Sequence, residues 1–132
     1  MTDFRIGTLV DTNILLDIVT NDPCWMSWSR LQLSRASVVG PLLINDVVYA
    51  ELSVRFESIE TLETALTELG VRLEPIPRAA LFLAAKAFRL YRSRGGTRTG
   101  VLSDFFVGAH AAVLNCALLT RDAGRYRHYF PT

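Results

Sequence analysis

Four acidic residues stand where the chain is expected to end a strand or to interrupt an apolar helix: Asp11, Glu51, Asp104 and Asp122. Asp11 directly follows the apolar run 6–10, and Asp122 follows a second apolar run, 116–120, after a single arginine. Carboxylate oxygens are the ligands that suit hard divalent cations such as Mg²⁺ and Mn²⁺. One or two such ions can activate a water, relieve the charge of a phosphate and stabilise a leaving alkoxide. Gathered in one place, the four acids could therefore support phosphodiester hydrolysis.

Each acid also has an ordinary structural explanation when it is taken alone. Asp11 could cap the helix that follows it, and Asp104 could do the same for a later helix. Asp122 could be a turn residue, and Glu51 could lie on the solvent face of its helix. These alternatives stay open at the level of single residues. His110 lies in an apolar helix, Gly108–Ala112, and we expect it to be structural because metal-assisted hydrolysis needs no histidine base.

The elements that would position these residues alternate between apolar strands and helices. We expect strands at 5–10, 38–44, 71–75 and 116–120, a short helix after the last of these, and an edge strand near Tyr129 and Phe130. We expect helices at 13–19, 24–36, 45–56, 58–69, 77–91 and 104–114, with a loop at 93–100. Asn45 or Asp46 can begin the third helix, and Gly70 can end the fourth. This pattern predicts an α/β fold with a central parallel sheet of four or five strands and helices on both faces.

The parallel sheet also predicts where a site would lie. Ligands of open parallel sheets bind beyond the carboxyl ends of the strands. Asp11 and Asp122 are expected at that edge because each follows a strand, and Asp104 could point to the same edge from a helix start.

The bulk composition sets limits on the class of protein. The 132 residues, half of them hydrophobic, predict a single domain over residues 1–132, and a net charge of +1 indicates no global attraction to nucleic acid or membrane. Cys24 and Cys116 form no metal motif, no signal peptide is evident, and no apolar run spans a bilayer, so we expect a reduced, cytoplasmic protein. A mean hydropathy of +0.25 hints at an apolar surface covered by a partner or by a second copy.

Four segments taken together resemble a known family. They are Asp11-Thr12-Asn13 after the first strand, Glu51 in an early helix, the block Ser103–Ala111, and Leu119–Asp122. This ordered set resembles the PIN domain, and more closely the VapC-type toxins of bacterial toxin–antitoxin pairs. The resemblance covers essentially the whole chain, and the block around Asp104 is its most specific part.

This resemblance implies a metal-dependent endoribonuclease that uses Mg²⁺ or Mn²⁺. Asp11, Glu51, Asp104 and Asp122 would be its catalytic, metal-binding acids, and Asn13 and Thr120 would form a supporting polar shell. The partners implied are an RNA substrate, with transfer and ribosomal RNA both candidates, a VapB-like antitoxin, and a second copy in a homodimer. No membrane partner is expected.

Arginines are the other residues that could bind RNA. Of the 14 basic residues only Lys86 is a lysine, and a GC-rich genome would give the same bias. Candidates for phosphate contacts are Arg94 and Arg98 in the glycine-rich loop, and Arg121 and Arg125 around Asp122. The alternative explanation is a solvated basic rim.

The competing function from another class is a non-catalytic RNA-binding or interaction module of the same fold. Presence of all four acids argues against it. A phosphoaspartyl phosphatase would also place an aspartate after its first strand, but its DxDx[TV] pattern fails here because the third position is Asn13.

Overall fold

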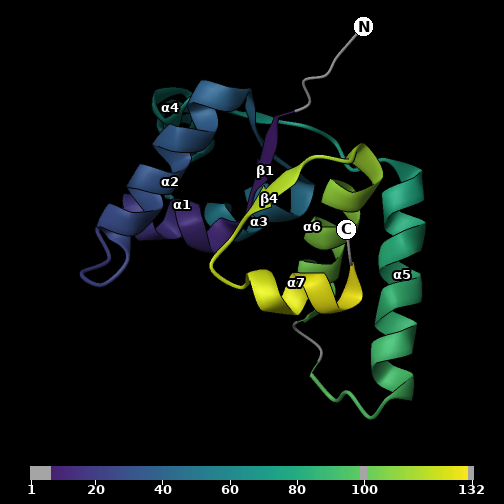
Figure 1. Ribbon diagram of the computed structural model, residues 1–132. Coiled ribbons are helices and arrows are strands. Elements are labelled where there is room, and N and C mark those ends of the chain that lie inside the picture. The colour runs from purple at the N-terminus through teal and green to yellow at the C-terminus, as the bar shows by residue number, and fades with distance from the viewer. Residues whose placement is uncertain (1–6, 99–100, 131–132) are drawn as a thin grey trace, which may run out of the picture.

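The computed structural model describes residues 7–98 and 101–130, in which a central sheet of parallel strands forms the middle layer (Figure 1). The strands are β1 (Thr8–Val10), β2 (Leu42–Ile44), β3 (Val71–Leu73) and β4 (Ala117–Leu119), in the order β3-β2-β1-β4. Every pairing is parallel, with Thr8 opposite Leu42, Ile44 opposite Leu73, and Val10 opposite Leu119. The predicted parallel sheet is therefore confirmed.

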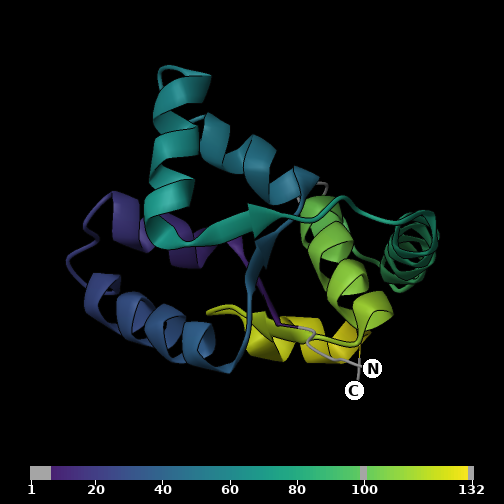
Figure 2. The same cartoon turned by 90° about the horizontal axis from the view of Figure 1, so that it is seen from above.

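Helices connect successive strands and lie on both sides of the sheet (Figure 2). They are α1 (Thr12–Val19), α2 (Met26–Val39), α3 (Asp46–Ser53), α4 (Ile59–Leu69), α5 (Arg78–Ser93), α6 (Val101–Leu114) and α7 (Ala123–Tyr129). The predicted α/β fold class is confirmed by this arrangement. Among the described residues, no helix has both the length and the apolar character that crossing a membrane requires.

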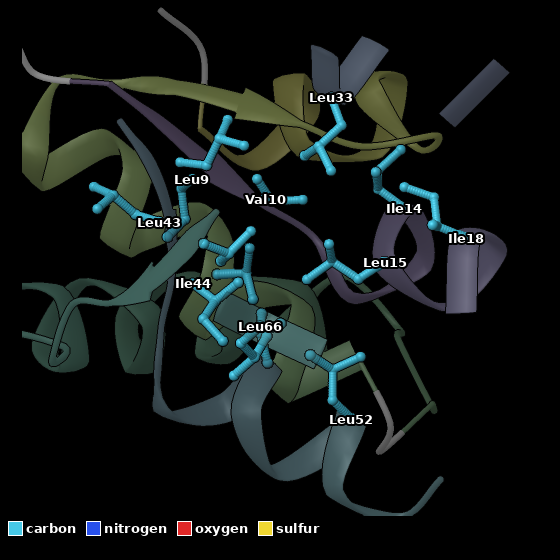
Figure 3. Close-up of a cluster of buried hydrophobic side chains, with 14 of the residues drawn as sticks. Leu9, Val10, Ile14, Leu15, Ile18, Leu33, Leu43, Ile44, Leu52 and Leu66 are labelled. Carbon is cyan, nitrogen blue, oxygen red and sulfur yellow. The ribbon is translucent and has the colours of Figure 1, made fainter. Parts of the chain in front are cut away.

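The main hydrophobic core surrounds β1 and β2 (Figure 3). Leu9, Val10 and Ile44 have no exposed surface, as expected for central strands of a sheet covered on both faces. Helices contribute apolar side chains from each side, including Leu33 of α2 and Leu52 of α3. Complete burial of one such side chain contributes about 1.5–3 kcal/mol. The core therefore fixes the strand ends from which the acidic residues project.

Local capping fixes where several helices begin and end. Asn45 accepts a hydrogen bond from the Val48 N–H (3.0 Å) at the start of α3, as predicted. Gly70, with φ of 73°, ends α4 in the left-handed region, which glycine adopts without a steric penalty. Both signals were correctly interpreted from the sequence because capping depends on a few neighbouring residues.

A second, smaller core joins α5 to α6. Ala80, Ala84 and Ala87 of α5 are buried against Val101 and Phe105 of α6. The alanines recur at nearly helical spacing, so one face of α5 is small enough for close approach. This hairpin of helices holds α6, and with it Asp104, against the rest of the domain (Figure 1).

Two predicted strands are corrected by the structure. Val38 and Val39, expected to begin the second strand, are the last residues of α2 and are 86% and 87% exposed. An apolar pair alone does not distinguish a buried strand from an exposed helix end.

The edge strand expected near Tyr129 and Phe130 is also wrong, since α7 runs to Tyr129. Aromatic residues favour strands, but here Tyr126 and Phe130, spaced four apart, pack on the core from one helical face.

Several helix boundaries also differ from the prediction, including those of α2, which covers Met26–Val39 rather than 24–36. The helix after β2 ends at Ser53 rather than Phe56, and the long helix α5 extends to Ser93 rather than Tyr91. The helix expected to begin at Asp104 already includes Val101, because Val101 and Phe105 are buried together in the α5–α6 core. The predicted loop is observed at 94–98, while residues 99–100 and 5–6 of the prediction lie outside the described residues.

Candidate functional site

Asp11 lies at the carboxyl end of β1 and is the N-cap residue of α1. Its carboxylate is buried, and it accepts hydrogen bonds at both oxygens. Oδ1 accepts from the Thr12 N–H (2.7 Å), while Oδ2 accepts from the hydroxyls of Thr120 (2.8 Å) and Tyr126 (3.1 Å). The capping role expected as the ordinary explanation of Asp11 is therefore present, but it accounts for only one of these contacts.

The sheet brings Thr120 to Asp11 across 109 positions of sequence. Val10 and Leu119 are opposite each other in the β1–β4 pair, so the residues that follow them emerge side by side. The Asp11 N–H also donates to the Leu119 carbonyl (2.9 Å). Adjacent ends of two parallel strands thus form this part of the site.

Asp104 approaches the same place from the first turn of α6. The Tyr126 hydroxyl lies 3.5 Å from its Oδ1 and 3.1 Å from Oδ2 of Asp11. One phenolic oxygen is therefore within hydrogen-bond distance of both carboxylates. Tyr126 thus contacts both an acid that follows a strand and an acid that lies in a helix.

The electrostatics of Asp11 reflect this crowding. Burial is the main cause that raises the pKa of its carboxyl above the ordinary value of 3.8, and the nearby charge of Asp104 raises it further. Hydrogen bonds from Thr120, Thr12 and Tyr126 act in the opposite direction but do not cancel the effect. A buried carboxylate with a like charge nearby is the environment in which a cation is most favourable.

Glu51 contacts Thr12, the residue that follows Asp11. It is half-buried in α3, and its Oε1 accepts from the hydroxyl of Thr12 at 2.5 Å. Thr12 is the first residue of α1 and directly follows Asp11, so Glu51 faces the start of α1 rather than open solvent. The ordinary explanation of Glu51 as a residue of the solvent face does not describe this contact.

Asp122, Asn13 and Thr120 complete the polar surroundings. The backbone N–H of Asp122 donates to the Thr120 hydroxyl (3.0 Å) just before α7 begins. The Asn13 side-chain amide lies 3.4 Å from both the Thr120 hydroxyl and Oδ2 of Asp11. Asn13 and Thr120 thus lie beside Asp11, and their supporting role remains a prediction.

The pair Asp11 and Asp104 can be tested for its fit to a divalent cation. Within residues 7–98 and 101–130, no three His, Cys, Asp or Glu side chains form a group that could hold a metal ion. The pair alone offers oxygen donors only, and Mg²⁺ is commonly held by one or two carboxylates while it keeps several waters. The donor chemistry therefore fits Mg²⁺ or Mn²⁺ at Asp11 and Asp104, whereas Glu51 and Asp122 are not gathered with them into one cluster.

Arg121 has a well-defined partner that the sequence did not suggest. Its Nε and Nη2 each lie 2.9 Å from a carboxylate oxygen of Asp17, which is 3% exposed. Asp17 also accepts from the Ser29 hydroxyl (2.6 Å), and the Arg121 guanidinium lies over the Trp25 ring at 4.8 Å. Arg121 therefore joins the turn before Asp122 to α1 and α2.

The other candidate arginines are more loosely placed. Arg94 and Arg98 are exposed in the connection between α5 and α6. The backbone N–H of Arg98 donates to the Tyr91 hydroxyl (3.0 Å), which fixes the path of that connection. The side chain of Arg125 lies outside the described part of the chain.

His110 belongs to the interior of the fold. It is fully buried, and its Nδ1 lies 3.3 Å from the side-chain amide nitrogen of Asn45, the cap of α3. Burial lowers the pKa of its imidazole below the ordinary value of 6.5, so the neutral ring is favoured. These contacts agree with the structural role expected for His110.

Tyr126 and Asp17 are the residues of this site that sequence reasoning missed. Tyr126 stands in an aromatic and basic segment, Arg125–Phe130, which we interpreted partly as a strand. The short helix predicted after residues 116–120 already places Tyr126 one turn after Asp122, but nothing in the sequence marks its hydroxyl as part of the site. Asp17 carried a clearer signal, since it is an acid in an otherwise apolar helical segment.

Comparisons with known proteins bear on this geometry. A model of the PIN domain family matches residues 8–131. A search of curated proteins found no match. A chain in the crystal structure of VapBC2 from Rickettsia felis, bound to a DNA fragment from their promoter, superposes with a TM-score of 0.70 at 16% identity, covering 94% of this chain and 92% of that one. A chain in the 2.2 Å structure of VapBC-1 from nontypeable Haemophilus influenzae gives a TM-score of 0.65 at 19% identity, covering 91% and 90%.

At these identities the two solved structures establish a shared fold. The family model extends over nearly the whole chain and includes Asp11, Glu51, Asp104 and Asp122. This chain therefore belongs to the PIN domain family.

Proposed function

We propose that this chain is a divalent-metal-dependent endoribonuclease that acts as the toxin of a VapBC-like toxin–antitoxin pair. PIN domains are nucleases that generally use divalent metals, and the fold matches chains of two VapBC complexes. The observation that carries the proposal is the meeting of Asp11 and Asp104 at one hydroxyl, at the carboxyl end of β1. This is the edge at which open parallel sheets bind their ligands.

Asp11 and Asp104 would hold a Mg²⁺ or Mn²⁺ ion, and Glu51 and Asp122 would add acids at the same edge of the sheet. When bound, the cation supplies an activated water and relieves the charge of the scissile phosphate. The chain itself contributes orientation. Thr120 and the Thr12 N–H hold the Asp11 carboxylate at both oxygens, so its direction is set before any ligand arrives.

The substrate in this proposal is RNA, with transfer and ribosomal RNA as the candidate classes. Exposed Arg94 and Arg98 could contact phosphates, as could Arg125 beside Asp122, whereas the proposed contact by Arg121 would compete with its ion pair to Asp17. Because the net charge is only +1, binding would depend on a local cluster of arginines rather than on a global field. Action on cellular RNA would place the protein in the cytoplasm.

A VapB-like antitoxin is the proposed protein partner, and it would cover the carboxylates of Asp11 and Asp104. Trp25, Trp28 and Leu31 near the start of α2 are 40%, 39% and 48% exposed and could provide an apolar surface for it. We also propose a homodimer. Light scattering of the purified chain should give twice the monomer mass, and a monomer at all concentrations would contradict the dimer.

Growth of bacteria that express the chain tests the proposed function. Expression of the wild type should arrest growth, and Asp104→Asn should abolish the arrest while circular dichroism shows an unchanged fold. Glu57→Gln, an exposed acid on the loop before α4, is the control and should remain toxic. Arrest that persists in folded Asp104→Asn and Asp11→Asn proteins would favour the alternative, a non-catalytic RNA-binding or interaction module.

A further inference from the structure

We infer that the hydroxyl of Tyr126 positions the carboxylates of Asp11 and Asp104 to receive a divalent cation. This inference rests on the proposed function, and it assigns a role to a residue of α7. The hydroxyl lies 3.1 Å from Asp11 Oδ2 and 3.5 Å from Asp104 Oδ1, and the Tyr126 side chain is buried. Tyr126 is thus a positioning residue rather than a ligand.

α7 packs closely enough on α6 for the Tyr126 side chain to fit between the two helices. Gly108 follows Asp104 by one helical turn, so the two residues share a face of α6. A Cβ at Gly108 would lie 2.9 Å from Cδ1 of Tyr126 and 2.5 Å from Cδ2 of Phe130. Only glycine leaves enough space there, and this close approach lets the Tyr126 hydroxyl reach Asp104.

The hydrogen bonding explains why the hydroxyl matters. Two like charges close together repel, and the Asp11 carboxylate is already buried. A phenol carries one hydrogen, so Tyr126 can donate to either carboxylate and keeps both within reach of one fixed atom. Thr120 holds the same Asp11 oxygen from β4, at 2.8 Å. Without the phenol, Asp104 loses the side chain that links it to Asp11, and the pair can separate.

Binding of Mn²⁺ to the purified chain, measured by electron paramagnetic resonance, tests this inference. Residues that orient metal ligands typically contribute about 10–100-fold in metal affinity. Tyr126→Phe, which removes one oxygen, should weaken Mn²⁺ binding by about tenfold. Tyr49→Phe is the matched control, because the Tyr49 hydroxyl donates to the exposed Glu63 at 2.6 Å, and it should bind as the wild type does.

The outcomes separate this inference from the proposed function. The proposed metal site itself would be overturned if the wild type bound no Mn²⁺. Equal Mn²⁺ binding by the wild type and by Asp11→Asn would overturn it as well. Wild-type binding that is lost in Asp11→Asn but unchanged in folded Tyr126→Phe would overturn only the role of Tyr126.

A second measurement uses the wild type and the control variant, and so does not depend on the folding of Tyr126→Phe. Addition of Mn²⁺ should change the near-ultraviolet tyrosine difference spectrum of the wild type and of Tyr49→Phe. Such a change shows that metal binding alters the surroundings of a tyrosine other than Tyr49, as contact of the Tyr126 hydroxyl with Asp11 and Asp104 requires. Mn²⁺ binding without any tyrosine signal would overturn the inference.

Discussion

At the scale of single residues, the site depends on a carboxylate whose burial is unfavourable without a cation. Asp11 is 6% exposed, caps α1, and has Asp104 nearby as a second negative charge. The hydrogen bonds it accepts from Thr12, Thr120 and Tyr126 only partly compensate for burial, since its pKa remains raised. Burial of Asp11 therefore lowers the stability of the fold and creates a site that attracts a cation, as is common where function requires buried charge.

The raised pKa of Asp11 predicts how stability depends on pH. The unfolded chain releases this proton near 3.8, whereas the folded protein holds it to higher pH. The fold therefore loses stability as the pH rises from that value through the raised pKa, and the loss is complete above it. Asp11→Asn removes this cost and keeps an N-cap residue of equal quality.

The Asp11→Asn variant should unfold at a higher temperature than the wild type at neutral pH, in the absence of divalent cations. In a domain of this size, about 1 kcal/mol moves the midpoint by roughly 4 °C. Mg²⁺ should raise the midpoint of the wild type but not that of the variant. Scanning calorimetry at neutral and acidic pH measures both effects, and a variant that is less stable at neutral pH would contradict this account of Asp11.

At the scale of elements, strand ends and caps could be predicted from the sequence, but contacts between distant elements could not. Asp11 follows β1 directly, so its place at the sheet edge depends on neighbouring residues alone. The meeting of Asp104 with Asp11 depends on how α6 and α7 pack, which involves Tyr126 and Gly108. Neither Tyr126 nor Gly108 carries a local signal for that contact, and the helix α7 was itself partly misassigned as a strand.

The link between Arg121 and Asp17 is a second contact between distant elements, separated by 104 positions. It ties the turn after β4, which precedes Asp122, to α1, and Ser29 of α2 binds the same Asp17 carboxylate. A sequence interpretation can propose that a basic residue beside a catalytic acid binds RNA, as we proposed for Arg121. The sequence alone does not show that this residue has a buried partner on another helix.

Asp17→Asn should destabilise the fold markedly because it leaves the Arg121 guanidinium without its counter-charge. Loss of one partner of a buried ion pair costs about 3–5 kcal/mol, and partial exposure of Arg121 places this case near the lower figure. Thermal unfolding should show a midpoint lowered by roughly 10 °C. Asp22→Asn is the control, since the Asp22 carboxylate caps exposed N–H groups of Cys24 and Trp25, a role that asparagine also fills. Equal midpoints for the two variants would show that the Asp17–Arg121 pair contributes little.

At the scale of the whole molecule, a parallel sheet with helices on both faces brings three elements to one edge. Asp11 follows β1, α6 supplies Asp104, and α7 supplies Tyr126, while Glu51 of α3 accepts a hydrogen bond from Thr12, next to Asp11. The fold class could be predicted because alternating apolar strands and helices allow few arrangements. The number and identity of bound cations depend on distances of a few ångströms, which no pattern of residues specifies.

The most direct test of the central claim is cleavage of total cellular RNA by the purified, antitoxin-free chain. The reaction would be run with Mg²⁺, with Mg²⁺ and excess chelator, and with the Asp104→Asn protein under Mg²⁺. The proposed nuclease should give discrete fragments only with the wild-type chain and available metal, because both the cation and its carboxylate ligand are required. Fragments that persist in excess chelator, or that a folded Asp104→Asn protein produces equally well, would contradict a metal-dependent ribonuclease centred on Asp11 and Asp104.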